Sequence, residues 1–156
     1  MSKITTTYEA SLEEHGELTL TNVGFSMRPM IRQGRDMFTV VKKTEARCQK
    51  YDVVLYRRPP SHYVLHRIIE VREDDYVILG DNCVTKEYGI RDEDIIGVLD
   101  RFVRKGKEYS VDHKGYRRYA KFWYAIFPLR RVWKNIKWFP VRTWRRLRGK
   151  TWQKPE

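Results

Sequence analysis

The chain has only two cysteines among its 156 residues, Cys48 and Cys83, and no Cys-x-x-C spacing. Two cysteines exclude a framework of disulfides, and they give a structural zinc site too few thiolate ligands. We therefore expect two free thiols in a reducing compartment. We expect neither a metal ion nor any other cofactor.

The sequence also lacks a long apolar run. A helix that spans a membrane needs about 20 consecutive apolar residues, and the longest apolar stretch covers only residues 122–129. The first residues have no basic start followed by an apolar segment, so no secretory signal is expected. The chain is accordingly predicted to be cytoplasmic, either free or peripheral on the inner face of the membrane.

Acidic residues are scarce toward the C-terminus. Residues 101–156 hold 18 Lys and Arg against 3 Asp and Glu, whereas the whole chain holds 32 against 20. All five tryptophans lie in the same part. An asymmetry of this size indicates modules with different partners. We divide the chain into a helical lead-in at 1–17, a peptidase-like β domain at 18–112 and a basic aromatic helical tail at 113–156.

Short strands dominate the pattern before residue 113. Alternating or continuous apolar segments are separated by Gly, Pro and Asp turns, and the one short helix ends at Gly16. This pattern favours a mostly β fold, a coiled antiparallel barrel-like sheet that becomes α+β once the tail is counted. The expected elements are a helix at 8–15 and strands at 17–23, 37–41, 52–56, 63–71, 76–79, 95–103 and 108–111.

From Lys114 the apolar spacing becomes helical. Three apolar stripes follow one another: Tyr116, Tyr119, Ala120, Trp123, Ile126 and Phe127, then Leu129, Val132, Trp133, Ile136 and Phe139, then Val141, Trp144 and Leu147. Cations lie opposite the stripes, which is typical of helices that bind an anionic membrane surface. Packing on the β domain and binding of nucleic acid stay open as alternatives for residues 114–150.

Three short stretches carry candidate catalytic side chains in the order serine, histidine, aspartate. Ser26 follows a predicted strand, His66 lies on the inward face of another strand, and Asp81 lies in a Gly-Asp-Asn turn. A serine hydroxyl becomes a nucleophile when a histidine removes its proton, and a carboxylate can orient that histidine. The order of these residues is therefore compatible with acyl transfer.

The same stretches resemble the boxes of the type I signal peptidases. Residues 24–29, Gly-Phe-Ser-Met-Arg-Pro, are similar to the Ser-Met-x-Pro nucleophile box, and residues 51–56 are similar to the Gly-Asp-Val-Val strand. Residues 80–82 and 94–98 resemble the closing boxes. The histidine at position 66, where bacterial members carry a Lys-Arg pair, resembles the archaeal and endoplasmic-reticulum branch. Self-cleaving repressor peptidases share the broad architecture.

The resemblance implies a serine endopeptidase that cleaves a peptide or protein, such as a leader or propeptide, through an acyl-enzyme. It implies Ser26 as the nucleophile, His66 as the general base, and either Asp81 or Glu87 as the acidic partner. Because Asp81 is short and held in a turn, we predict that Asp81 orients His66.

The resemblance also bears on the oxyanion hole and leaves a second function open. The backbone N–H of Ser26 would be one oxyanion donor, while Gly24 replaces the hydroxyl residue that often supplies another. The alternative function is a non-catalytic adaptor of peptidase fold that binds peptide while its basic tail binds membrane or nucleic acid.

Overall fold

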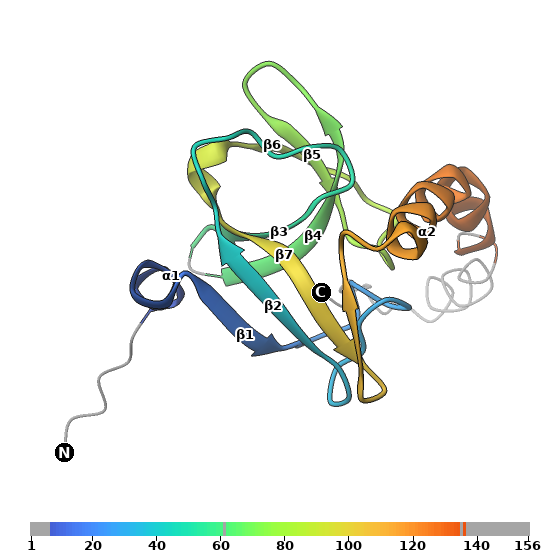
Figure 1. The fold of residues 1–156 in the computed structure, drawn as a ribbon. Coiled ribbons are helices and arrows are strands. Elements are labelled where there is room, and N and C mark those ends of the chain that lie inside the picture. Colours follow the sequence, from blue (N-terminus) through green and yellow to red (C-terminus); the bar gives the residue numbers. More distant parts are fainter. Residues whose placement is uncertain (1–6, 61, 135, 137–156) are drawn as a thin grey trace, which may run out of the picture.

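A single antiparallel sheet forms most of the structure, a computed structural model that describes residues 7–60, 62–134 and 136 (Figure 1). The eight strands follow the hydrogen-bonded order β1-β2-β7-β3-β4-β5-β6, and β8 pairs with β7. Their bounds are β1 Glu17–Thr21, β2 Met37–Lys42, β3 Val53–Arg58, β4 His62–Val71, β5 Tyr76–Leu79, β6 Glu87–Ile90, β7 Ile95–Arg104 and β8 Lys107–Ser110.

The sequence predicts every strand except β6 to within a few residues. The mostly β, antiparallel character is confirmed, and with the helices the fold is α+β. The barrel is not confirmed, because β1 and β6 form the two ends of the described sheet and do not pair with each other. Strand β6 gives little signal because it has four residues, starts with Glu87 and contains Gly89 at φ 75°, so no apolar alternation marks it.

Two α-helices lie at opposite sides of the molecule in Figure 1. Helix α1, Tyr8–His15, begins at a cap formed by the Thr7 hydroxyl. It ends at Gly16 with φ 74°, the end that the sequence predicts. Helix α2 covers Lys114–Ala125, and helical backbone resumes at residues 127–134 after a turn. A short 3₁₀ turn, η1, occupies Asp92–Asp94. No helix in the described ranges has both the length and the apolar character needed to cross a membrane.

The predicted apolar stripes of the tail have different surroundings. Much of the first stripe packs inward: Ala120 and Phe127 are buried, and Tyr116 lies against the main core. This part of the tail is therefore a structural layer of the β core. The second stripe is 56% to 73% exposed at Leu129, Val132, Trp133 and Ile136. Phe139 and the stripe within residues 141–147 lie outside the described residues.

Candidate active site

Ser26 lies in the loop that joins β1 to β2. The loop is anchored by Met27, Met30 and Ile31, which are buried in the main core; each such side chain contributes roughly 1.5–3 kcal/mol on burial. Gly24 has φ 89°, a conformation that favours glycine, which accounts for the missing hydroxyl side chain at that position. Ser26 itself is half-buried, and the anchored loop fixes its main chain.

The turn after β5 contacts this loop directly. The Asn82 N–H donates to the Ser26 carbonyl oxygen at 2.6 Å, and Asn82 Nδ2 donates to the Phe25 carbonyl oxygen at 3.0 Å. At Gly80, a Cβ would lie 2.8 Å from His66 Nε2 and 2.9 Å from the Ser26 carbonyl oxygen. Cβ contacts that short essentially never occur, so only glycine fits here. The Ser26 main chain and the His66 imidazole therefore border the same small space.

His66 is held on β4, opposite Val54 of β3, and is only 4% exposed. Its Nδ1 lies 3.0 Å from Glu87 Oε1 and 3.4 Å from the Tyr56 hydroxyl oxygen. Its Nε2 is buried and has no hydrogen-bond partner within the part of the chain that the structure describes. With a proton on Nδ1 directed at the carboxylate, Nε2 carries the lone pair of a neutral imidazole. We infer this tautomer from the contacts of the ring.

The electrostatics of the pair favour a charged Glu87 and a basic His66. Burial alone would lower the pKa of His66, but the neighbouring Cys83 and Glu87 outweigh burial and raise it. Burial alone would raise the pKa of Glu87, but hydrogen bonds from His66, Tyr56 and Arg58 outweigh burial and lower it to about 2. The Tyr56 hydroxyl donates to Glu87 Oε2 at 2.7 Å, and Arg58 donates to Oε1. Glu87 is therefore a fixed carboxylate beside the base.

Asp81 has a different partner from the one predicted. Its carboxylate accepts two hydrogen bonds of 2.9 Å from Arg67 and one of 3.0 Å from the Tyr119 hydroxyl. Among the described residues it forms no hydrogen bond or ion pair with His66. The prediction that Asp81 rather than Glu87 orients the imidazole is corrected by this geometry: Glu87 contacts the ring, and Asp81 neutralises a buried arginine.

The reason for the correction lies in the alternation of β4. Arg67 follows His66, so the two side chains point to opposite faces of the sheet. The face that carries Arg67 is otherwise apolar at Leu65 and Ile69, and from α2 Tyr116 accepts a hydrogen bond from Arg67 at 3.0 Å. The side chains of Arg67 and Asp81 are each only 2% exposed. A buried guanidinium needs a carboxylate partner, and the turn after β5 supplies Asp81.

The segment that begins with α2 also holds the main chain of the same turn. Trp123 Nε1 donates to the Asp81 carbonyl oxygen at 2.7 Å, and Arg130 donates to the same oxygen. Lys134 donates to the Asn82 carbonyl oxygen and, at 2.9 Å, to Asn82 Oδ1. Some cations of the tail thus act as fixed donors to the site and are not free for another partner.

The predicted Ser26–His66 pair is only partly assembled. Ser26 Oγ forms no hydrogen bond with His66 in the described residues, although the Ser26 carbonyl oxygen and Nε2 both border the space at Gly80. The structure therefore brings together Ser26, His66 and Glu87 of the predicted site residues, and it places the Asp81 carboxylate on Arg67.

Sequence reasoning missed four side chains around the site: Tyr56, Arg58, Arg67 and Cys83. Tyr56 and Arg58 stand two positions apart on β3, so strand alternation alone places them on one face. Their shared contact with Glu87 was hidden because β6 itself was not predicted. Cys83 lies in a loop, where no periodicity marks a residue.

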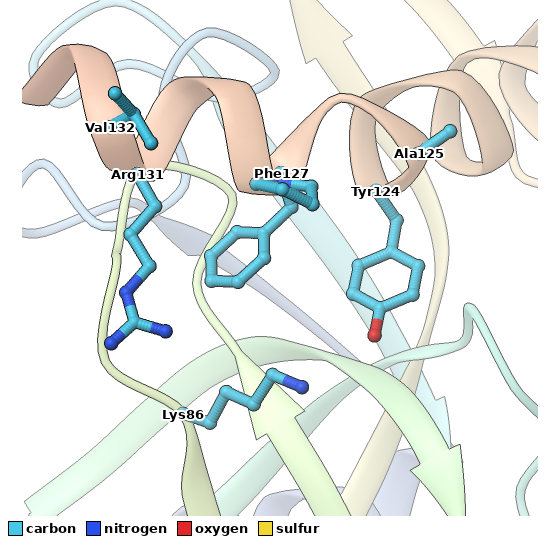
Figure 2. Close-up of a pocket in the computed structure, with 7 residues that line it drawn as sticks. Lys86, Tyr124, Ala125, Phe127, Arg131 and Val132 are labelled. Atoms are coloured by element: carbon cyan, nitrogen blue, oxygen red, sulfur yellow. The ribbon is translucent and has the colours of Figure 1, made fainter.

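A pocket of about 610 Å³ lies where α2 ends and the helical backbone of residues 127–134 begins. Figure 2 shows side chains that line it. Its lining is mostly apolar and comes from the loop before β6 and from the helix above it: Lys86, Tyr124, Ala125, Phe127, Pro128, Arg131 and Val132. Neither Ser26 nor His66 lines this pocket. It is therefore separate from the predicted catalytic groups.

No protein family, no curated protein and no solved structure matches the chain. Within the described ranges, no three His, Cys, Asp or Glu side chains gather so that they could hold a metal ion. The functional assignment accordingly depends on the geometry of the residues around His66.

Proposed function

We propose that the protein is a serine peptidase in which Ser26 is the nucleophile, His66 the general base and Glu87 the carboxylate that orients the base. The observation that carries the proposal is the state of His66. Its Nδ1 is held by Glu87 at 3.0 Å, while its Nε2 is buried, free of partners among the described residues, and borders the Ser26 loop. A structural core histidine would satisfy both ring nitrogens.

The proposed reaction follows from these positions. Nε2 takes the Ser26 hydroxyl proton as Oγ attacks the carbonyl carbon of the peptide bond, and Glu87 stabilises the imidazolium that forms. The imidazolium then gives the proton to the leaving amine as the carbon–nitrogen bond breaks. Water attacks the acyl-enzyme with His66 again as the base and releases Ser26. The Ser26 N–H would donate to the oxyanion.

The Ser26 hydroxyl has to turn toward Nε2 for this chemistry. A serine side chain has a single carbon–carbon torsion with three staggered positions, and Ser26 is only half-buried. Catalytic hydrogen bonds are often loose in the absence of substrate. The main chain of Ser26 is held by the Asn82 hydrogen bond, so the proposal requires the hydroxyl to move toward Nε2 by rotation of the side chain.

The strand that leads to Ser26 supports an extended peptide as the substrate. Strand β1 ends one side of the described sheet and leads directly into the Ser26 loop. An extended peptide that adds to a sheet edge gains main-chain hydrogen bonds and is delivered toward the loop that follows. We therefore infer an extended leader or propeptide as substrate. We also infer a core of the signal-peptidase type, in which the bound substrate adds a strand beside β1.

A fluorophosphonate probe tests the assignment, because it reacts with activated serines. We expect labelling of Ser26 that is lost in Ser26→Ala and His66→Gln. Ser110→Ala and His62→Gln are matched controls, since both residues are exposed and lie outside the site, and these variants should label normally. Absence of Ser26 labelling in the folded protein would favour the non-catalytic adaptor.

We also propose an anionic membrane surface as the partner of the exposed second stripe. Four apolar side chains that follow helical spacing are more than half exposed: Leu129, Val132, Trp133 and Ile136. Binding of nucleic acid needs cations and stacking rings, but it gives no reason for exposed aliphatic side chains. Insertion at a lipid headgroup boundary buries such side chains and places nearby cations at the anionic surface. The membrane is therefore the favoured partner.

A further inference from the structure

Cys83 is a free thiol at the candidate site, in the turn that follows β5. Its N–H donates to the Gly80 carbonyl oxygen at 2.8 Å, which folds the chain back toward the end of β5. A Cβ on Gly80 would lie 2.7 Å from Cys83 Sγ and 2.8 Å from His66 Nε2. The sulfur and the imidazole nitrogen therefore face the same space from two sides.

The nitrogen that borders this space is available as a base. His66 is 4% exposed, and its Nε2 has no hydrogen-bond partner among the described residues. An unpaired buried nitrogen is costly, so a proton donor that can approach it is favoured. Cys83 is half-buried and is one of the groups that raise the pKa of His66.

The turn that carries the thiol is held by the segment that begins with α2. Arg130 and Lys134 donate to the carbonyl oxygens of Asp81 and Asn82, the two residues that precede Cys83. These contacts fix the main chain before Cys83 and keep the sulfur at the space that Nε2 also borders.

We propose that Cys83 is a covalent modification site for soft carbon electrophiles, a thiol that uses His66 as its base. The sulfur attacks the electrophilic carbon, the bond from carbon to the leaving halide breaks, and the thiol proton moves to Nε2. The product is a thioether and the halide leaves as an anion. The added group occupies the space beside Gly80 and keeps the Ser26 hydroxyl from reaching Nε2. This last consequence rests on the proposed peptidase function, whereas the thiol chemistry does not.

Iodoacetamide is the probe, and the full chain provides an internal control. Cys48 is also a free thiol, but it is buried, and burial raises its pKa to about 11. We expect Cys83 to be alkylated roughly tenfold or more faster than Cys48 at neutral pH, measured by peptide mass spectrometry. His66→Gln should slow alkylation of Cys83 by about tenfold, while His62→Gln should leave it unchanged.

The results separate this proposal from the peptidase assignment. Alkylation of Cys83 that depends on His66, without fluorophosphonate labelling of Ser26, supports the reactive thiol and overturns the peptidase. Loss of Ser26 labelling after alkylation supports both proposals. A Cys83 rate that equals the Cys48 rate, or that does not change in His66→Gln, overturns the reactive thiol whatever Ser26 does. If His66→Gln does not fold, Glu87→Gln gives the same test by removing the carboxylate that holds the imidazole.

Discussion

Replacement of Asp81 by asparagine removes the charge that neutralises Arg67 but keeps nearly the same shape. The Arg67 and Asp81 side chains are each 2% exposed, and two hydrogen bonds of 2.9 Å join them. Loss of one partner of a buried ion pair costs roughly 3–5 kcal/mol, since the other charge stays buried without compensation. Asparagine retains one acceptor oxygen, so we expect the low end, about 3 kcal/mol.

For a chain of this size that free energy corresponds to a fall in Tm of about 6–12 °C. Thermal and urea denaturation followed by circular dichroism measure the change. A second substitution, Arg67→Met in the Asp81→Asn background, removes the stranded charge and should recover part of the lost stability. Glu87→Gln is the control at the candidate base, where the carboxylate is more accessible and the loss of stability should be smaller.

The opposite result would refute this account of the turn. If Asp81→Asn kept its Tm within about 2 °C and lost fluorophosphonate labelling of Ser26 while Glu87→Gln kept it, Asp81 would be the carboxylate that serves His66. The Arg67 pair would then be a secondary contact.

Other perturbations test the remaining contacts. Only neutral His66 accepts a proton, and its pKa is raised. Labelling of Ser26 should therefore fall as pH drops, with a midpoint above the ordinary pKa of histidine. Glu87→Gln should move this midpoint down and slow labelling by about 10²-fold or more, and an unchanged midpoint would contradict the Glu87 contact. Gly80→Ala should cost about 1–3 kcal/mol in the free energy of unfolding. It should also block labelling of Ser26, because the added methyl group meets the His66 ring. Normal stability and labelling would count against the close approach of Gly80 to His66. Trp133→Ala should weaken binding to anionic vesicles, measured by co-sedimentation, more than Arg118→Gln does, and equal effects would favour a purely electrostatic partner.

Most of the sheet could be predicted because local apolar patterns in the sequence identify its strands. Alternation and continuous apolar runs mark β2 to β5 and β7, and glycine marks the end of α1. The β6 strand could not be predicted, because it lacks an apolar pattern and depends on pairing with β5 and on contacts of Glu87 that form only in the folded chain. Because β6 was not predicted, the contact between Glu87 and His66 was not predicted either.

The sequence names candidate residues for the site but does not report their contacts. The short motifs point to Ser26 and His66, and the Ser26 carbonyl oxygen and the His66 ring both border the space at Gly80. The choice between Asp81 and Glu87 depends on which carboxylate meets Arg67 and which meets His66, and that depends on where α2 and β6 pack. A helix's docking site is a tertiary property that spacing along one strand does not report.

The Arg67–Asp81 pair also couples the unfolding of three segments of the chain. Arg67 belongs to β4, Asp81 follows β5, and Tyr116 and Tyr119 of α2 complete the cluster through their hydroxyl groups. Detachment of α2 would bring water to a charge pair whose geometry depends on all three segments. Amide protons of β4, β5 and α2 should therefore exchange with solvent through one shared opening event. The start of the basic tail consequently belongs to the same cooperative folding unit as the sheet, and a chain that ends before Tyr116 would lack part of that unit.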